Sequence, residues 1–148
     1  MNQNKIPLPI RIAEGGVLPL YATALASGAD LHSSIMEPVV IEPGNTAIIP
    51  TGIRLEIPSG YEVQIRPRSG LAAKHGVTVL NAPGTIDADY RGEICVILIN
   101  HGREPFLVVP KMRIAQMVLS PVMRADFAQV EELTVSQRGE GRFGHTGA

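Results

Sequence analysis

The stretch "IRLEIPSGYEVQIR", residues 53–66, determines the fold class that we expect. Every second residue is apolar in 53–57, and the same alternation returns in 61–65. Such a period of two is typical of β-strands with one buried face. The sequence Pro-Ser-Gly at 58–60 separates the two runs and is typical of a tight turn. The stretch therefore predicts two strands joined as a β-hairpin.

The rest of the chain repeats this pattern of short apolar runs between turn residues. "VVIEPGNTAIIPTG" (39–52) has turn signals at 43–44 and 50–52, and four further runs follow: "GVTVL", "EICVILIN", "FLVVP" and "RIAQMVL". The 15 glycines and 12 prolines are spread evenly and leave little room for long helices. Only "LAAKH", 71–75, resembles a helix. We expect an all-β sandwich, jelly roll or barrel.

Composition indicates one folded domain without a strongly charged partner. The chain has 148 residues, of which 45% are hydrophobic and 18% charged, with a formal net charge of -1. This balance gives no electrostatic reason to bind nucleic acid or an anionic membrane. No apolar run approaches the roughly 18 residues of a spanning helix, and no secretion signal is recognisable at the start. The single cysteine, Cys95, fits a reducing compartment, so we expect a cytoplasmic protein.

The run "EICVILIN", residues 93–100, is apolar on both faces. One face carries Ile94, Val96 and Leu98, and the other carries Cys95, Ile97 and Ile99. A strand covered on both sides lies either in the middle of a fold or in a subunit interface. Because a small β domain has room for few central strands, this pattern favours an oligomer.

Two polar segments carry candidate phosphate ligands. In "RPRSGLAAKHG", 66–76, the side chains of Arg66, Arg68 and Ser69 and the amide of Gly70 precede a short helix, and such donors suit phosphate oxygens. The alternative is a helical turn capped by Ser69. In "RIAQMV", 113–118, Gln116 interrupts an apolar strand. A buried glutamine needs partners, which either a neighbouring strand or a ligand would supply.

Three glycine-containing segments remain. "SGADLHS", 27–33, reads as a turn that leads into a strand with Asp30 exposed. "NAPGTIDADYRGEI", 81–94, reads as a strand that turns and comes back, and Asp87 is either a general base towards water or an acid at a strand edge. "RGEGRFGHTG", 138–147, is either an anion-binding loop with an aromatic lid or a disordered tail. It lacks the lysine of a P-loop.

The histidines show no paired spacing of metal ligands, so a zinc site held by the protein is not expected. Any metal would be a hard cation that arrives with phosphates.

Taken in order, the five segments resemble the five motifs of the trimeric dUTPases, and G-x-I-D-x-x-Y-x-G is intact in the third. The resemblance implies a jelly-roll-like, distorted β-barrel over residues 1–136 and a homotrimer with shared active sites. It implies that the tail, 137–148, closes over a neighbouring subunit's site. The implied reaction is hydrolysis of dUTP to dUMP and pyrophosphate, with Mg²⁺ carried by the triphosphate. That reaction limits uracil in DNA and supplies dUMP for thymidylate synthesis.

The same resemblance implies a role for each motif residue. Asp87 would be the base that activates water at the α-phosphorus, Tyr90 would lie beneath the deoxyribose, and Asp30 would act through the metal's water shell. The other implied substrate contacts are Arg68, Ser69, Gly70 and Gln116 for phosphates, Asn81, Gly84, Thr85 and Ile86 around uracil, and Arg138, Phe143, Gly144, His145 and Thr146 in the tail.

Two rival functions remain open at the level of sequence. The homologous dCTP deaminases place a catalytic glutamate where this chain has Ile97, and an aliphatic residue cannot shuttle protons. A non-catalytic nucleotide-binding trimer would keep the fold but would not need Asp87. One departure from the resemblance is Arg142, at a position of the fifth motif where the family often has glycine.

Overall fold

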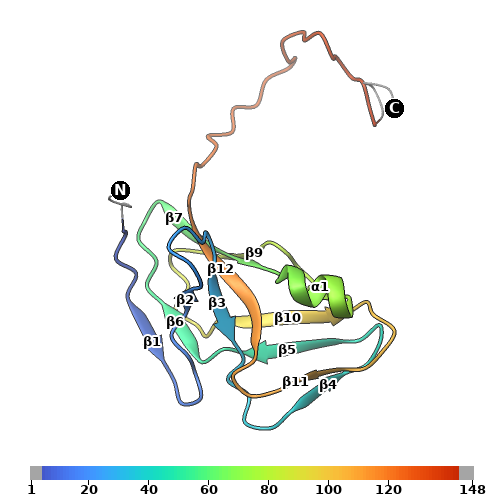
Figure 1. Cartoon of the computed structure of the whole chain (residues 1–148). Helices are drawn as coiled ribbons and strands as arrows, with labels where there is room; N and C mark the ends of the chain where they lie inside the picture. Colours follow the sequence, from blue (N-terminus) through green and yellow to red (C-terminus); the bar gives the residue numbers. More distant parts are fainter. Residues whose placement is uncertain (1–4, 144–148) are drawn as a thin grey trace.

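The computed structural model describes residues 5–143 and is nearly all-β (Figure 1). Within this range the chain forms one helix, α1 (Ser69–His75), and short strands. The strands are β1 (Ile10–Ile12), β2 (Leu20–Tyr21), β3 (Ala29–His32), β4 (Val39–Ile41), β5 (Thr46–Pro50), β6 (Ile53–Leu55), β7 (Tyr61–Arg66), β8 (Val77–Val79), β9 (Gly84–Ile86), β10 (Cys95–Asn100), β11 (Phe106–Val108) and β12 (Arg113–Pro121). The expected all-β class is confirmed.

The strands form separate antiparallel sheets that share one core. The largest has the order β2-β3-β12-β7-β9, a second has the order β5-β10-β8, and two pairs, β1-β6 and β11-β4, complete the body. Side chains from both larger sheets, such as Leu31, Val63, Ile49 and Leu98, belong to the same buried cluster. The described strands therefore do not close into one barrel.

Neither hairpin expected from the sequence is formed. β6 pairs with β1, whereas β7 lies between β12 and β9 in another sheet. Likewise β9 and β10 belong to different sheets, and residues 87–94 cross between them. The alternating pattern correctly indicates which face of each strand is buried, but it does not specify the partner strand.

The outer face of β10 is only partly covered by its own chain. Val96 and Leu98 are buried in the core, whereas Cys95 is exposed and Ile97 half-buried. Ile97 is paired with Ile48 of β5, whose side chain is 68% exposed. β10 is the middle strand of its sheet, but only one of its faces is fully covered within the chain, and its outer apolar face remains available to another surface.

The short helix α1 is confirmed, but its cap differs from the expectation. Arg68 is the N-cap residue and makes no capping hydrogen bond with its side chain, so the alternative with Ser69 as the cap is wrong. The helix ends at Gly76, whose φ of 66° is left-handed, as is common at helix ends.

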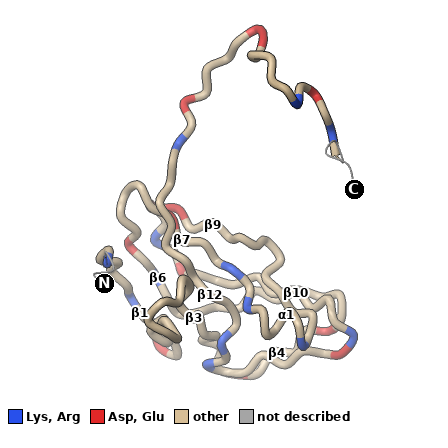
Figure 2. The backbone as a smooth tube through the Cα atoms, turned by 45° about the horizontal axis from the view of Figure 1, so that its top comes forward, with Lys and Arg blue, Asp and Glu red and all other residues tan. Residues whose placement is uncertain are grey.

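After β12 the chain leaves the body. Residues 122–143 contain neither helix nor strand, and they extend away from the sheets (Figure 1). Basic and acidic residues are interspersed over the body and along this extended segment (Figure 2). No helix among residues 5–143 is long and apolar enough to span a membrane.

Candidate active site

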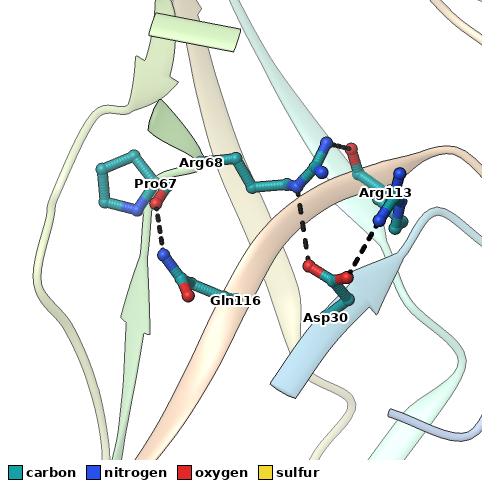
Figure 3. A network of polar contacts seen from close by, with 5 residues as sticks. All are labelled: Asp30, Pro67, Arg68, Arg113 and Gln116. Atoms are coloured by element: carbon teal, nitrogen blue, oxygen red, sulfur yellow. Dashed lines mark hydrogen bonds and ion pairs between the residues drawn. The ribbon is translucent and has the colours of Figure 1, made fainter. Parts of the chain in front are cut away.

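A row of polar side chains crosses three strands of the large sheet. Gln116 of β12 is paired with Asp30 of β3 on one side and with Arg66 of β7 on the other. Because paired residues lie side by side across a sheet, this register gathers segments that are far apart in sequence. Arg68 follows β7 directly and so lies beside the same row (Figure 3).

Asp30 is held between two arginines (Figure 3). Its Oδ1 lies 3.5 Å from Nε of Arg68, and its Oδ2 lies 3.3 Å from Nη1 of Arg113. Arg68 also donates from Nη1 to the carbonyl oxygen of Arg113 at 3.3 Å. Two guanidinium groups around one carboxylate leave a positive charge, which suits an anion. We call these three residues the arginine cluster; Arg113 was not among the residues singled out from the sequence.

Gln116 has its partner within the chain. Its Nε2 donates to the carbonyl oxygen of Pro67 at 3.0 Å. Its side chain also lies against Gly28, since a Cβ added to that glycine would collide with Oε1 of Gln116. A glycine at position 28 is therefore needed for the observed position of the glutamine. Of the two kinds of partner considered for Gln116, the structure contains one within the chain, the carbonyl of Pro67 immediately after β7.

The carboxylate of Asp87 stands at the start of the turn after β9. The turn is closed by a hydrogen bond from the Tyr90 amide to the Asp87 carbonyl at 3.1 Å and is braced by Arg91, which donates to the Ala88 carbonyl at 2.7 Å. Asp87 is exposed, and among residues 5–143 its side chain makes no hydrogen bond or ion pair. It is therefore free to accept a proton from a bound molecule.

The ring of Tyr90 is fixed from two directions. Its hydroxyl donates to the carbonyl oxygen of Glu93 at 2.9 Å, and its ring lies so close to Gly92 that a Cβ there would collide with it. The carboxylate of Glu93 in turn accepts from the Gly52 amide at 2.8 Å. A glycine two residues after Tyr90 is thus needed because any Cβ at position 92 would collide with the tyrosine ring.

Four of the predicted residues line one cavity of about 290 Å³. These are Thr85, Ile86, Asp87 and Tyr90, and residues 93–94 together with residues of β5 and β10 complete its wall. Asn81 does not line this cavity, nor does Gly84, which is buried against Ile65. The segment 81–94 thus places the carboxylate of Asp87 and the ring of Tyr90 at the same cavity.

The cavity and the arginine cluster occupy different ends of the strand β7. Ile86, next to Asp87, is paired with Val63, whereas Gln116 is paired with Arg66. Three residues along a strand correspond to about 10 Å. Within one chain, therefore, the structure does not bring Asp87 together with Arg68.

The remaining predicted residues lie elsewhere. Ser69 and Gly70 are exposed at the start of α1. In the tail, Arg138 donates from Nε to the Gly141 carbonyl at 3.2 Å, and Phe143 is fully exposed. Gly144, His145 and Thr146 lie outside the described residues.

Two titratable groups near these sites have shifted pKa values. Burial lowers the pKa of His32 on β3, and the nearby carboxylate of Asp30 opposes the shift only in part. Burial raises the pKa of the Cys95 thiol, and the carboxylate of Glu93 adds to that shift. Cys95 is therefore a poor candidate for a nucleophile.

The described residues offer no protein-only metal site. Among residues 5–143 no three His, Cys, Asp or Glu side chains gather in a way that could hold a metal ion. Both oxygens of Asp30 already face arginines. The donor set fits a hard cation only if phosphate oxygens supply most of its ligands.

Fold and site together define a nucleotide hydrolase of the all-β dUTPase type. A family model described as dUTPase matches residues 15–147, and the chain belongs to this family. The deoxyuridine 5'-triphosphate nucleotidohydrolase of Chlamydia pneumoniae is 64% identical over 135 residues, which cover 90% of this chain and 93% of that protein. The enzyme of the same name from Chlamydia caviae is 58% identical over 139 residues, covering 92% and 95%.

Solved structures agree with this assignment. A mutant dUTPase of Staphylococcus bacteriophage 80alpha with dUpNHpp has a TM-score of 0.87 and 27% sequence identity, and the match covers 99% of this chain and all of that one. A mutant dUTPase from phage phi11 of S. aureus, described as coordinating a structural Mg(II) ion, has a TM-score of 0.78 and 25% identity, covering 86% and 98%.

Proposed function

We propose that this protein is a dUTP diphosphatase that hydrolyses dUTP to dUMP and pyrophosphate in the cytoplasm. Its role would be to limit uracil in DNA and to supply dUMP for thymidylate synthesis. The observation that carries the proposal is the cavity in which the unpaired carboxylate of Asp87 lies beside the fixed ring of Tyr90. The 64% identity to a nucleotidohydrolase of this name supports the choice of substrate.

The exposure of Asp87, and the absence of a side-chain partner for it within residues 5–143, support a role as general base. Asp87 would take a proton from water as the water oxygen forms a bond to the α-phosphorus. The bond from that phosphorus to the α,β-bridging oxygen breaks, and pyrophosphate leaves with the electron pair. Such a transfer depends mainly on positioning and on stabilising charge. An exposed carboxylate without an internal partner suits the first requirement.

The donors for the phosphates come from the second and fourth segments. Arg68, Ser69, Gly70 and Gln116 would hold the triphosphate, with Asp30 near the water shell of the metal. Mg²⁺ bound to the phosphates would neutralise charge that builds up in the transition state. The exposure of Ser69 and Gly70 at the start of α1 and the positive charge of the arginine cluster support this assignment.

Tyr90 would select deoxyribose over ribose. Its hydroxyl bond to Glu93 and its contact with Gly92 hold the ring at the cavity wall. A rigid ring beneath a deoxyribose leaves no room for a 2′-hydroxyl, which explains a preference for dUTP over UTP. The uracil edge would be read beside it by Asn81 and the main chain of Gly84, Thr85 and Ile86.

The site would be completed between subunits. Since Asp87 and Arg68 are apart within one chain, we infer a homotrimer in which the cavity of one subunit meets the arginine cluster of its neighbour. The exposed apolar face around Ile48 and Ile97 supplies a surface for such contact. The tail, 137–148, would then close over a neighbouring site with Phe143 on the uracil, and Arg138, Gly144, His145 and Thr146 around the substrate.

Pyrophosphate release from dUTP, dCTP, TTP and UTP with Mg²⁺ tests the reaction. We expect release from dUTP and a loss of at least about a thousandfold in kcat for Asp87→Asn, with binding of dUpNHpp retained. Unchanged turnover in Asp87→Asn would show that another group is the base. Ammonia release from dCTP would identify a deaminase, and binding without turnover would identify a nucleotide-binding protein.

Mixed oligomers test the shared site. Asp87→Asn and Arg68→Gln should each be nearly inactive alone. If each site takes Asp87 from one subunit and Arg68 from another, trimers refolded from an equal mixture should regain about a quarter of wild-type activity, because both positions are intact at random in that share of sites. No recovery in trimers of confirmed mixed composition would place both residues in one subunit's site.

A further inference from the structure

Arg113 and Arg68 share a single carboxylate, and this sharing has a consequence for substrate binding. Arg113 holds Oδ2 of Asp30, while Arg68 holds Oδ1. Asp30 is the least exposed of the three, at 19% for its side chain, compared with 26% for Arg68 and 53% for Arg113. The carboxylate is thus the least accessible of the three groups, and each of its oxygens faces one of the two guanidinium groups (Figure 3).

A bidentate contact of Arg68 with phosphate would draw on a nitrogen that now faces Asp30 or the Arg113 carbonyl, because only Nη2 has no contact within residues 5–143. In the observed arrangement its Nε faces Asp30 and its Nη1 donates to the Arg113 carbonyl. When Arg68 turns to a triphosphate, Asp30 loses one of its two cations. A largely buried carboxylate left without a cation next to a polyanion would oppose binding.

We propose that Arg113 is a positioning residue for the triphosphate, which neutralises Asp30 so that Arg68 is free to bind the substrate. The inference rests on the proposed function and adds a residue to the site. Arg113 is placed for this role at the first position of β12, where an irregularity in the pairing with β3 follows it. Its carbonyl anchors Arg68, while its side chain holds Asp30, so both contacts come from one residue.

Loss of Arg113 would have two effects in the same direction. Asp30 would attract Arg68 more strongly before substrate binds, and it would repel the phosphates after Arg68 has turned. Both effects weaken binding of the ground state and the transition state alike, so they raise KM without a comparable change in kcat. For charges a few ångströms apart near a protein surface, we expect a rise in KM of about tenfold.

The test is a double-mutant cycle on the full-length protein. Arg113→Met and Arg113→Lys are made alone and in combination with Asp30→Asn, and KM and kcat for dUTP and the Kd of dUpNHpp are measured. Arg113→Met should raise KM and Kd about tenfold and change kcat less than about twofold, while Arg113→Lys should restore most of the affinity. With Asp30→Asn present, Arg113→Met should change KM and Kd less than about twofold, because no carboxylate remains to be neutralised.

Arg103→Met serves as the matched control. Arg103 is exposed between β10 and β11 and makes no ion pair within residues 5–143. The substitution Arg103→Met removes the same charge without affecting Asp30, so KM for dUTP should stay near the wild-type value. Thermal unfolding of every variant confirms that losses do not come from unfolded protein.

Several outcomes would overturn the inference. If Arg113→Met raises KM equally with and without Asp30→Asn, Arg113 acts on the substrate directly. If Arg103→Met raises KM as much as Arg113→Met does, the effect is one of overall charge. A fall in kcat at constant KM would also contradict it. If wild type binds dUpNHpp but releases no pyrophosphate, the proposed function fails while the cycle in Kd still decides the role of Arg113. If wild type does not bind dUpNHpp, both are overturned.

Discussion

Gly92 lies against the ring of Tyr90, so Gly92→Ala moves that ring without changing any polar group. A Cβ at position 92 would collide with the hydroxyl and with ring carbons of Tyr90. The ring is 44% exposed and can swing towards solvent, which relieves the collision without straining the core. The main loss for the free protein is then the hydrogen bond from the hydroxyl to Glu93, with a net contribution of about 1 kcal/mol.

The effect on function should be larger than the effect on stability. If the ring excludes a 2′-hydroxyl, its displacement should lower the ratio of kcat/KM for dUTP to that for UTP at least about tenfold, or about 1.4 kcal/mol of discrimination. Tyr90→Phe keeps the ring over Gly92 and removes only the hydroxyl, so it should lose less of this ratio. Steady-state rates for the two nucleotides and urea unfolding measure both quantities.

Gly44→Ala is the matched control. Gly44 has φ +80° in open space at the turn between β4 and β5, so alanine there costs about 1–2 kcal/mol of backbone strain without touching the cavity. Its ratio of dUTP to UTP should equal that of wild type. A Gly92→Ala protein that is destabilised like Gly44→Ala but keeps its discrimination within twofold would refute the role of the ring position.

Three further predictions test the packing around the site and the core. Gly28→Ala should displace Gln116 and raise KM for dUTP about tenfold with little change in kcat, as measured by pyrophosphate release. Burial lowers the pKa of His32 below its ordinary value of 6.5, so the unfolded chain takes up the proton first. The free energy of unfolding therefore has its full contribution from neutral His32 above pH 6.5 and loses that contribution as the pH falls. In urea unfolding, His32→Gln should lose less stability than wild type on acidification. Asn100 is buried and donates to two carbonyl groups at 2.8 Å, so Asn100→Leu should lower the free energy of unfolding by about 2–4 kcal/mol in urea while a folded sample keeps its kcat.

The sequence predicts strands and turns better than it predicts their partners. Turn signals at 43–44 and 50–52 coincide with left-handed glycines, Gly44 and Gly52, because a positive φ is a local demand that glycine meets. Pairing is not local. β7 lies between β12 and β9, and its paired residues are about twenty positions away in β9 and fifty to sixty positions away in β12. Both expected hairpins fail for this reason.

The residues of the candidate site likewise differ in whether a local sequence pattern can predict their position. Asp87 and Tyr90 are close in sequence, and a short turn brings them to one cavity, as the motif suggested. Arg113 looks like an ordinary charged residue at the start of a strand. Only the side-chain contacts across β3 and β12 show that it shares Asp30 with Arg68, because in the register Arg113 is paired with His32. Residues whose role depends on a contact across strands are thus missed by reading one strand at a time.

The proposed shared site would link catalysis to assembly. Within one chain, Asp87 and the arginine cluster lie near different positions of β7, because Ile86 is paired with Val63 and Gln116 with Arg66. In the proposed trimer, a neighbouring subunit would bring the arginine cluster to the cavity that contains Asp87. The outer face of β10 and β5 leaves Ile48 exposed and Ile97 half-buried, and burying these side chains in an interface would stabilise an oligomer. The same contact that covers Ile48 and Ile97 would then border the cavity, because both residues also line its wall. Subunit association would in this way form the site as well as stabilise the fold, and an isolated subunit would keep its sheets but lack the reaction.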